Sequence, residues 1–493
     1  MNKSEEYGVK VFNINYIIIA SMISLLNSLY YANFPVMCLL AAAQIFVLIR
    51  YLIKGQDIKY LCLYIIFLST SMESALFVGV DKFYGFKEFK IASINLGVIF
   101  ILLPFLKFII NGSIQNPFKA KGYVGIFVKG VFILTPLAFF MGLFGLLLND
   151  NNILSKITSF SMFIDASYIF ILVAVETIVI YTIVKRNLKE INEIKQCLLA
   201  IIISLAITLV SSLLFENYGN RGGLPSLQVS NIIMLLVCAV LLPFYKEYNK
   251  KVKAILLLIT GTILILGLIY NTNGKMVLTA MLVPIAILII QLRRKLYRAT
   301  FFTLIMGFFM IYLSLKFIVP SISSTSFLFS TKLEQASSML LFGSGWLENM
   351  PSSPKMRIAQ ILNITSEYLE KPWFIFTGKG YLGTIKDNLS LFTGADEFAY
   401  SSWQLNNSLY YMMHETLNTL YLTNGIIGLV FFVLMFKIII SKFHKSPWMM
   451  VGGFWFLLFY SYSVTISIFG VTALIIGLLD LDQERLSYKK KHR

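Results

Sequence analysis

Runs of about twenty apolar residues recur along almost the whole chain, and this pattern constrains the fold more than any other feature. A helix of that length spans the roughly 30 Å hydrocarbon core of a bilayer. Of the 493 residues, 57% are hydrophobic and only 13% are charged, which excludes a soluble globular enzyme, a disordered chain and a disulfide-rich secreted module. The sequence therefore predicts an all-α polytopic membrane protein.

The apolar runs predict about fourteen transmembrane helices and one large external loop that contains short helices. The expected spans are 15–31, 34–53, 59–79, 90–110, 124–148, 160–184, 195–215, 227–245, 253–270, 275–292, 299–319, 416–440, 448–463 and 465–480. Three regions follow: transmembrane helices 1 to 11 in residues 1–319, the external loop in 320–415, and transmembrane helices 12 to 14 with a basic tail in 416–493.

The distribution of Lys and Arg predicts the orientation of these spans. With the N-terminus inside, the inside segments hold 29 of the 42 basic residues, and the outside segments hold 13, of which 7 lie between Lys316 and Lys386. Short cytoplasmic loops are enriched in Lys and Arg, so this excess of basic residues in the inside segments favours this orientation. We therefore expect both termini in the cytoplasm, and the formal charge of +18 reflects topology rather than nucleic-acid binding.

The external loop contains one segment with clear helical signals. Ser353 is expected as N-cap and Pro354 as the first helical residue, and the helix should end before Pro372. Apolar residues recur at intervals of three to four positions, at Ile358, Ile361, Leu362, Tyr368 and Leu369. This spacing predicts that this face of the helix docks on another part of the protein.

A few polar residues on the outer side are candidates for chemistry. His414 is the one histidine of three expected outside; it is either a general base for a hydroxyl or an interfacial hydrogen-bonding group. Four outside cations could hold an anion such as a phosphate, with surface ion pairs as the alternative. They are Arg221, Lys275, Arg357 and Lys379.

The segment Gly378 to Gly383 fits the pattern G-x-G-x-x-G, but no strand–turn–helix unit surrounds it, which excludes a Rossmann site. A turn whose backbone amides approach a phosphate or sugar remains the functional alternative. His414-Glu415 begins like the zinc motif HExxH, but Asn418 stands where the motif requires its second histidine. We expect no metal and no cofactor.

Three acidic residues lie inside expected spans, at Glu73, Asp165 and Glu176. A charged group is costly in a bilayer, so each should face the interior of the helical bundle. Substrate binding, structural pairing and proton relay are all consistent with such a position.

Several of these segments together resemble the O-antigen polymerase and O-antigen ligase superfamily. The family's pattern is an arginine, a glycine-rich turn, a histidine followed by asparagine, and a Gly-Ile-Ile-Gly-like start of a span. The matching residues are Asn220 to Gly223 with Asn231, Asn273 to Lys275, Arg357 to Pro372, Thr377 to Gly383, His414, and Thr423 to Leu429. Glu415 replaces the usual asparagine, Lys275 replaces a usual arginine, and the Arg221 loop lacks an aromatic-Gly-Asn-Pro-Asn run.

The resemblance implies a metal-independent, inverting membrane glycosyltransferase of the bacterial cytoplasmic (inner) membrane. Its donor would be an oligosaccharide on undecaprenyl pyrophosphate, which it would polymerise into O-antigen or capsule. His414 would be the general base, and Arg221, Arg357, Lys275 and Lys379 would hold the pyrophosphate. Supporting roles would fall to Glu415, Gly378, Gly380, Tyr381 and Asn424.

The partners implied are lipid-linked oligosaccharides and the bilayer, together with a flippase and a chain-length regulator; no nucleic acid is expected. Two other functions stay open. A ligase of the same family would transfer the glycan to lipid A-core, but its basic outer rim is not evident. A lipid-linked oligosaccharide flippase would also have about fourteen spans, but repeated halves and short outer loops are expected of transporters.

Overall fold

The computed structural model describes part of the chain in detail. The described residues are 14–30, 33–69, 90–91, 94–119, 122–147, 160–187, 190–214, 219–221, 224–226, short pieces between 288 and 305, 352–392, 400, 402–411, 413 and 416–443.

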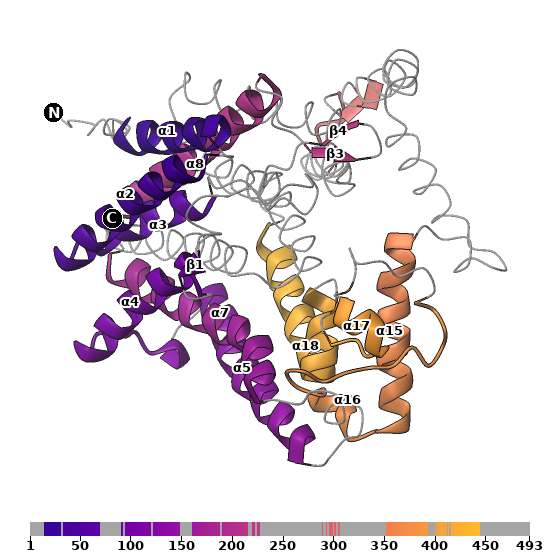
Figure 1. The fold of residues 1–493 in the computed structure, drawn as a ribbon. Helices are drawn as coiled ribbons and strands as arrows, with labels where there is room; N and C mark the ends of the chain where they lie inside the picture. The colour runs from indigo at the N-terminus through magenta and orange to yellow at the C-terminus, as the bar shows by residue number, and fades with distance from the viewer. Residues whose placement is uncertain are drawn as a thin grey trace.

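The described part is mostly helical (Figure 1). Its helices are α1 (Ile14–Tyr30), α2 (Phe34–Ile53), α3 (Asp57–Ser69), α4 (Leu96–Ile110), the short 3₁₀ helix η2 (Pro117–Lys119), α5 (Gly122–Leu147), α7 (Phe160–Arg186), α8 (Ile191–Leu214), α15 (Ser352–Glu370), α16 (Phe374–Thr377), α17 (Ser402–Asn407) and α18 (Thr416–Phe443). The strands among the described residues form two short antiparallel hairpins, β1 (Lys90–Ile91) with β2 (Ile94–Asn95) and β3 (Gly219–Arg221) with β4 (Leu224–Ser226).

Most described helices coincide with the apolar runs. The runs 15–31, 34–53, 124–148, 160–184, 195–215 and 416–440 each correspond to one helix, with ends that differ by at most four residues. The run 90–110 is partly wrong, because Lys90–Ile91 and Ile94–Asn95 form the paired strands β1 and β2 and the helix begins at Leu96. The spans expected at 227–245, 253–270, 448–463 and 465–480 lie outside the described residues, as do most residues of 275–292 and 299–319 and the second half of 59–79.

Three described helical segments are long and apolar enough to cross a membrane. They are Phe34–Ile53 in α2, Val128–Gly145 in α5 and Leu417–Leu434 in α18. Shorter apolar helices occur over Asn15–Asn27 and Ile99–Ile110. The described residues therefore support a mostly helical protein with segments able to span a membrane.

Local signals fix the ends of α2. The side chain of Asn33 accepts a hydrogen bond from the backbone N–H of Val36 at 3.2 Å, which satisfies one of the amides that a helix start leaves unpaired. At the other end the chain turns at Gly55, whose φ of +69° suits glycine. The helix is therefore defined by its own caps as well as by its apolar composition.

Small residues let α1 pack closely against α8. Ala20, Ser24 and Ser204 are completely buried, and Ser204 donates a hydrogen bond to the carbonyl of Ala20 at 2.8 Å. The hydroxyls of Ser24 and Ser204 also contact each other. Small residues and serine hydroxyls at helix contacts are typical of helices that associate in a lipid environment.

A proline in α4 explains a contact with α3. Pro104 has no N–H, so the carbonyl of Phe100, four residues earlier, lacks its helical donor. The hydroxyl of Tyr60 donates to this carbonyl instead, and Tyr60 is 1% exposed. The side chain from the neighbouring helix thus supplies the hydrogen bond that the proline removes.

The expectation that Glu176 faces the bundle interior is confirmed, because the residue is 1% exposed in α7. Its Oε1 lies 3.5 Å from the hydroxyl of Tyr64, and that hydroxyl also lies 3.1 Å from the carbonyl of Gly97. Its Oε2 has no hydrogen-bond partner among the described residues. The backbone of Asp165 lies in α7, and Glu73 lies outside the described residues.

Because a charged carboxylate is costly at a site as buried as that of Glu176, we expect a protonated, neutral carboxyl there. The variant Glu176→Gln keeps the volume and the neutral hydrogen-bonding character. It should change the free energy of unfolding by less than about 1 kcal/mol, while Glu176→Ala should cost about 2 kcal/mol or more through the cavity it leaves. Thermal denaturation of the detergent-solubilised protein measures both. A glutamine variant as unstable as the alanine variant would contradict the neutral state.

The C-terminal helices form a unit that rests on α5. In Figure 1, α15 to α18 (orange to yellow) gather beside the lower part of α5. Both α16 and α18 contact α5, and α15 and α16 contact α18. We call residues 352–392 together with 400–443 the α15–α18 unit.

Candidate functional site

The α15 helix is the centre of the α15–α18 unit. It begins at Ser352, two residues before the expected first helical residue Pro354, so Ser353 lies inside the helix and is not its N-cap; its end at Glu370, before Pro372, agrees with the prediction. Its buried positions recur at helical spacing: Met356, Ala359, Gln360, Asn363, Ile364, Glu367 and Tyr368. One face of the helix is therefore docked.

The docked face differs from the face that the apolar residues predict. Ile361 and Leu362 are 38% and 39% exposed and Leu369 is 74% exposed, while Ile358 is partly buried; of the five predicted positions only Tyr368 is buried. The reason is that three polar side chains occupy the docked face: Gln360, Asn363 and Glu367 each form hydrogen bonds inside the unit.

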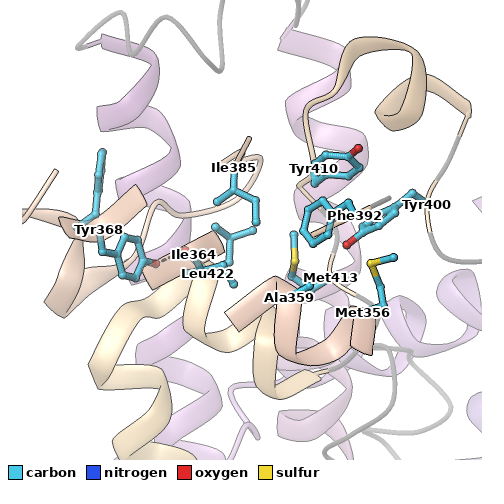
Figure 2. Close-up of a cluster of buried hydrophobic side chains, with 11 residues drawn as sticks. Met356, Ala359, Ile364, Tyr368, Ile385, Phe392, Tyr400, Tyr410, Met413 and Leu422 are labelled. Carbon is cyan, nitrogen blue, oxygen red and sulfur yellow. Dashed lines mark hydrogen bonds between the residues drawn. The ribbon is translucent and has the colours of Figure 1, made fainter. Parts of the chain in front are cut away.

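A cluster of apolar and aromatic side chains holds the docked face (Figure 2). Phe392, Tyr400 and Tyr410 gather at one end, with ring centroids 4.6 Å apart for Phe392 and Tyr410 and 4.5 Å for Tyr400 and Tyr410. Tyr368 lies at the other end. These aromatic contacts hold the connecting segments between α16 and α18 to one another, and the cluster as a whole packs them on α15.

Asp387 organises the segment that follows the glycine-rich turn. Its carboxylate accepts hydrogen bonds from the backbone of Leu391 and Phe392, each at 2.8 Å, and from the side chain of Asn363 at 2.9 Å. This segment also pairs with the residues before α18 through a β-bridge between Ile385 and Tyr410. The irregular backbone is therefore fixed by polar contacts to α15.

The α18 helix is broken at Gly425. This residue has φ of +59° and ψ of −145°, which are not helical. A Cβ built on Gly428 would lie 2.6 Å from the carbonyl oxygen of Leu420, although residues eight apart in a straight helix are about 12 Å apart. The helix therefore bends sharply, and the predicted straight span 416–440 consists of two helical arms.

The turn at Gly378 to Gly383 packs against this break. The backbone N–H groups of Lys379 and Gly380 donate to the carbonyls of Leu422 and Thr423 at 2.8 and 3.1 Å, and the N–H of Tyr381 donates to Ala138 of α5 at 3.0 Å. A break after residue 424 leaves such carbonyls without helical donors. The turn satisfies them, so these three amides are engaged and do not face a phosphate or sugar.

Lys379 is a buried, paired residue rather than an exposed cation. Its side chain is 0% exposed, and its Nζ lies 2.6 Å from Oε1 of Glu367 and 2.8 Å from the carbonyl oxygen of Thr384. Burial by itself would raise the pKa of Glu367, but the ammonium groups of Lys379 and Lys371 outweigh this and hold that pKa below its ordinary value. The expected role of Lys379 in holding pyrophosphate is corrected: its charge is neutralised inside the unit.

Tyr368 and Asn424 also form hydrogen bonds where the glycine-rich turn, α18 and α5 meet. The Tyr368 hydroxyl donates to the carbonyl of Tyr421 at 2.6 Å, and burial raises the pKa of Tyr368, which keeps the hydroxyl protonated as a donor. Asn424 is 2% exposed and donates from Nδ2 to the carbonyl of Leu134 in α5 at 2.9 Å. Asn424, Gly378, Gly380 and Tyr381 therefore come together, and they hold α5, α16 and α18 in contact.

Arg357 stands at the other end of α15. It lies in the first turns of the helix and is partly exposed. Its backbone carbonyl accepts a hydrogen bond at 3.1 Å from Nδ2 of Asn418, in the first turn of α18. In sequence, Asn418 comes four residues after His414.

Other predicted site residues are only partly described. Arg221 ends strand β3, where it pairs with Leu224 across the hairpin, and its side chain is not described. Lys275, His414 and Glu415 lie outside the described residues. Within the part of the chain that the structure describes, no group of three or more His, Cys, Asp or Glu side chains is arranged to hold a metal ion.

Sequence reasoning missed the polar residues that join α15 to its surroundings. These are Gln360, Asn363, Glu367, Asp387 and Asn418. The spacing of Gln360, Asn363 and Glu367 at three and four residues was a usable signal, because it matches the period of one helix face.

Comparisons of this chain with protein-family models, with curated proteins and with solved structures found no match.

Proposed function

We propose that this protein is a metal-independent, inverting glycosyltransferase that polymerises oligosaccharide repeat units carried on undecaprenyl pyrophosphate. It would act at the outer face of a bacterial cytoplasmic membrane, with both termini inside. The proposed topology has about fourteen spans. Residues 320–415 form the external loop in this topology, and the apolar helices α2, α5 and α18 are consistent with it.

One observation carries the proposal furthest. The backbone carbonyl of Arg357 is held beside the first turn of α18 by the Asn418 hydrogen bond, and Asn418 follows His414 and Glu415 in the sequence by four and three residues. A cation and a general base at one junction are what glycosyl transfer from a pyrophosphate donor requires, because the base activates the acceptor and the cation stabilises the leaving group.

In the proposed reaction, His414 removes the proton from a sugar hydroxyl of the acceptor as that oxygen attacks the anomeric carbon of the donor. The new glycosidic bond forms as the bond to the pyrophosphate breaks, and attack from the opposite side inverts the anomeric centre. The leaving pyrophosphate takes the electron pair, and Arg357 and Arg221, assisted by Lys275, stabilise its charge. Glu415 orients the imidazole of His414. Lys379 is not part of this set, because Glu367 neutralises it.

The test is the length distribution of surface glycan in a strain that lacks this gene, complemented with variants at matched membrane abundance. We expect His414→Ala to give single repeat units where the wild type gives a ladder. The control His444→Ala changes a histidine that the topology places inside, and it should leave the ladder unchanged. Arg357→Ala should shorten or abolish the ladder, whereas Lys355→Ala, two residues earlier on the same helix, should not.

Other results would favour the alternatives. Polymer that forms but stays lipid-linked in the deletion strain would indicate a ligase that transfers the glycan to lipid A-core. A wild-type ladder from His414→Ala would remove His414 as the base and favour a flippase of lipid-linked oligosaccharides.

A further inference from the structure

The side chain of Asn418 joins the first turn of α18 to the N-terminal half of α15. It is 1% exposed and donates from Nδ2 to the carbonyl of Arg357 at 3.1 Å and to Oε1 of Gln360 at 2.8 Å. Gln360 in turn donates from Nε2 to the hydroxyl of Tyr400 at 2.8 Å. A chain of three buried polar side chains therefore runs from the start of α18, across α15, to the segment before α17.

The side-chain amide of Asn418 donates hydrogen bonds to two different acceptors. An asparagine amide carries two N–H protons, and here one is directed to the Arg357 backbone and the other to the Gln360 side chain. Aspartate has no donor, and an apolar side chain has neither donor nor acceptor. Of the common side chains of this size, only asparagine satisfies both acceptors.

Burial alone does not explain why an asparagine is used. Its Oδ1 is buried and has no hydrogen-bond partner among the described residues. A buried acceptor left without a partner costs about 1 to 3 kcal/mol, which an apolar side chain would avoid. What explains the asparagine is its two donated hydrogen bonds, which hold Arg357 and Gln360 of α15 against the start of α18.

We propose that Asn418 is a positioning residue: it fixes the backbone of Arg357, whose side chain is proposed to hold the pyrophosphate, in one register against the start of α18. This inference rests on the proposed function. In a reaction that needs a base and a cation at one donor, displacement by roughly 1 Å costs on the order of 100-fold in rate. Asn418 acts through Arg357 and does not contact the substrate.

The test is a double-mutant cycle on the full-length protein in nanodiscs, with an undecaprenyl-pyrophosphate-linked repeat unit as donor and rates expressed per folded protein. We expect Asn418→Ala to lower kcat about 10- to 100-fold with KM changed less than about 3-fold. In an Arg357→Ala background, the same change should have less than about 2-fold effect, because the residue it positions is absent. Asn418→Asp keeps the volume, so it supplies a second variant that folds, and it should show the same coupling.

Asn363→Ala is the matched control. Asn363 is an equally buried asparagine on α15, but it is bound to Asp387 and not to Arg357 or α18. It should lower stability while leaving kcat per folded protein within about 2-fold. The positioning role is overturned if Asn418→Ala has wild-type kcat, or if it slows the Arg357→Ala protein by its full factor. Full activity of His414→Ala is a separate outcome that overturns the proposed function itself.

Discussion

Replacing Gly425 with alanine is expected to prevent the α15–α18 unit from folding. A Cβ at this position would lie 2.5 Å from the carbonyl oxygen of Ile375, 2.6 Å from the backbone nitrogen of Gly378 and 2.7 Å from the carbonyl carbon of Phe376. All three contacts are with backbone, so no side chain can rotate away. Separating α16 from α18 would also break the amide contacts that satisfy the Leu422 and Thr423 carbonyls. We expect a loss of more than about 4 kcal/mol, which is exceptional for one methyl group.

Gly55→Ala separates the effect of the clash from the effect of backbone conformation. Gly55 also has positive φ, +69°, but a Cβ there would meet nothing within 4 Å. Alanine at Gly55 should therefore cost only the left-handed conformation, about 1 to 2 kcal/mol. Thermal stability of the solubilised protein, together with protease resistance of residues 371–392, measures the difference. Equal stability of the two variants would show that the backbone contacts at Gly425 are not formed.

Gly378→Ala is expected to match Gly425→Ala. Its Cβ would lie 2.4 Å from the backbone nitrogen of Asn424, on the opposite side of the same contact. Both glycines have positive φ, and each leaves room for the backbone of the other. Two positions 47 residues apart in sequence should thus give one phenotype.

The sequence was sufficient to locate the helices that depend on local signals. The boundaries of α2, α5 and α7 follow from the length of an apolar run, and the end of α15 follows from Pro372. These signals lie within a few residues of the helix that they define. The same reasoning placed Glu176 in the bundle interior, because an acidic side chain facing lipid would be too costly.

Contacts between distant segments were not predictable in this way. The break in α18 lies within an apolar run, and a single glycine there does not indicate whether the helix continues. The partners of the turn amides are Leu422, Thr423 and Ala138, which are tens to hundreds of residues away. The docked face of α15 was misassigned because apolar residues were expected to be buried, whereas Gln360, Asn363 and Glu367 are buried through hydrogen bonds. Lys379 was misassigned for a different reason: its partner Glu367 lies on another element, so the residues around Lys379 do not reveal the ion pair.

Removing the charge of Lys379 is the second change for which we expect a large effect. Glu367 is 2% exposed, and Lys379→Met would leave its carboxylate buried without its closest cation. Removing one partner of a buried ion pair costs about 3 to 5 kcal/mol. Lys371 also approaches Glu367, at 3.2 Å, but it is 23% exposed and lies one helical turn away, so Lys371→Ala should cost less than about 1 kcal/mol.

The double variant Lys379→Met with Glu367→Gln tests whether the cost arises from the unpaired charge. It removes both charges and should recover most of the stability lost in Lys379→Met, because a neutral pair of similar volume carries no desolvation penalty for ions. Chemical denaturation of the solubilised protein at neutral pH compares the three variants. A double variant less stable than Lys379→Met alone would show that the shape of the side chains, and not the ion pair, matters at this site.

The same pair predicts how the stability depends on pH. The pKa of Glu367 is lowered in the folded protein, so the unfolded chain binds its proton at a higher pH than the folded one. The stabilisation from the ion pair is therefore complete above the unfolded value of about 4.3 and is lost as the pH falls through the lower folded pKa. Between pH 5 and 8 this pair contributes no pH dependence. In the double variant the corresponding loss below about pH 4 should disappear, because no carboxyl remains at position 367 to take up a proton.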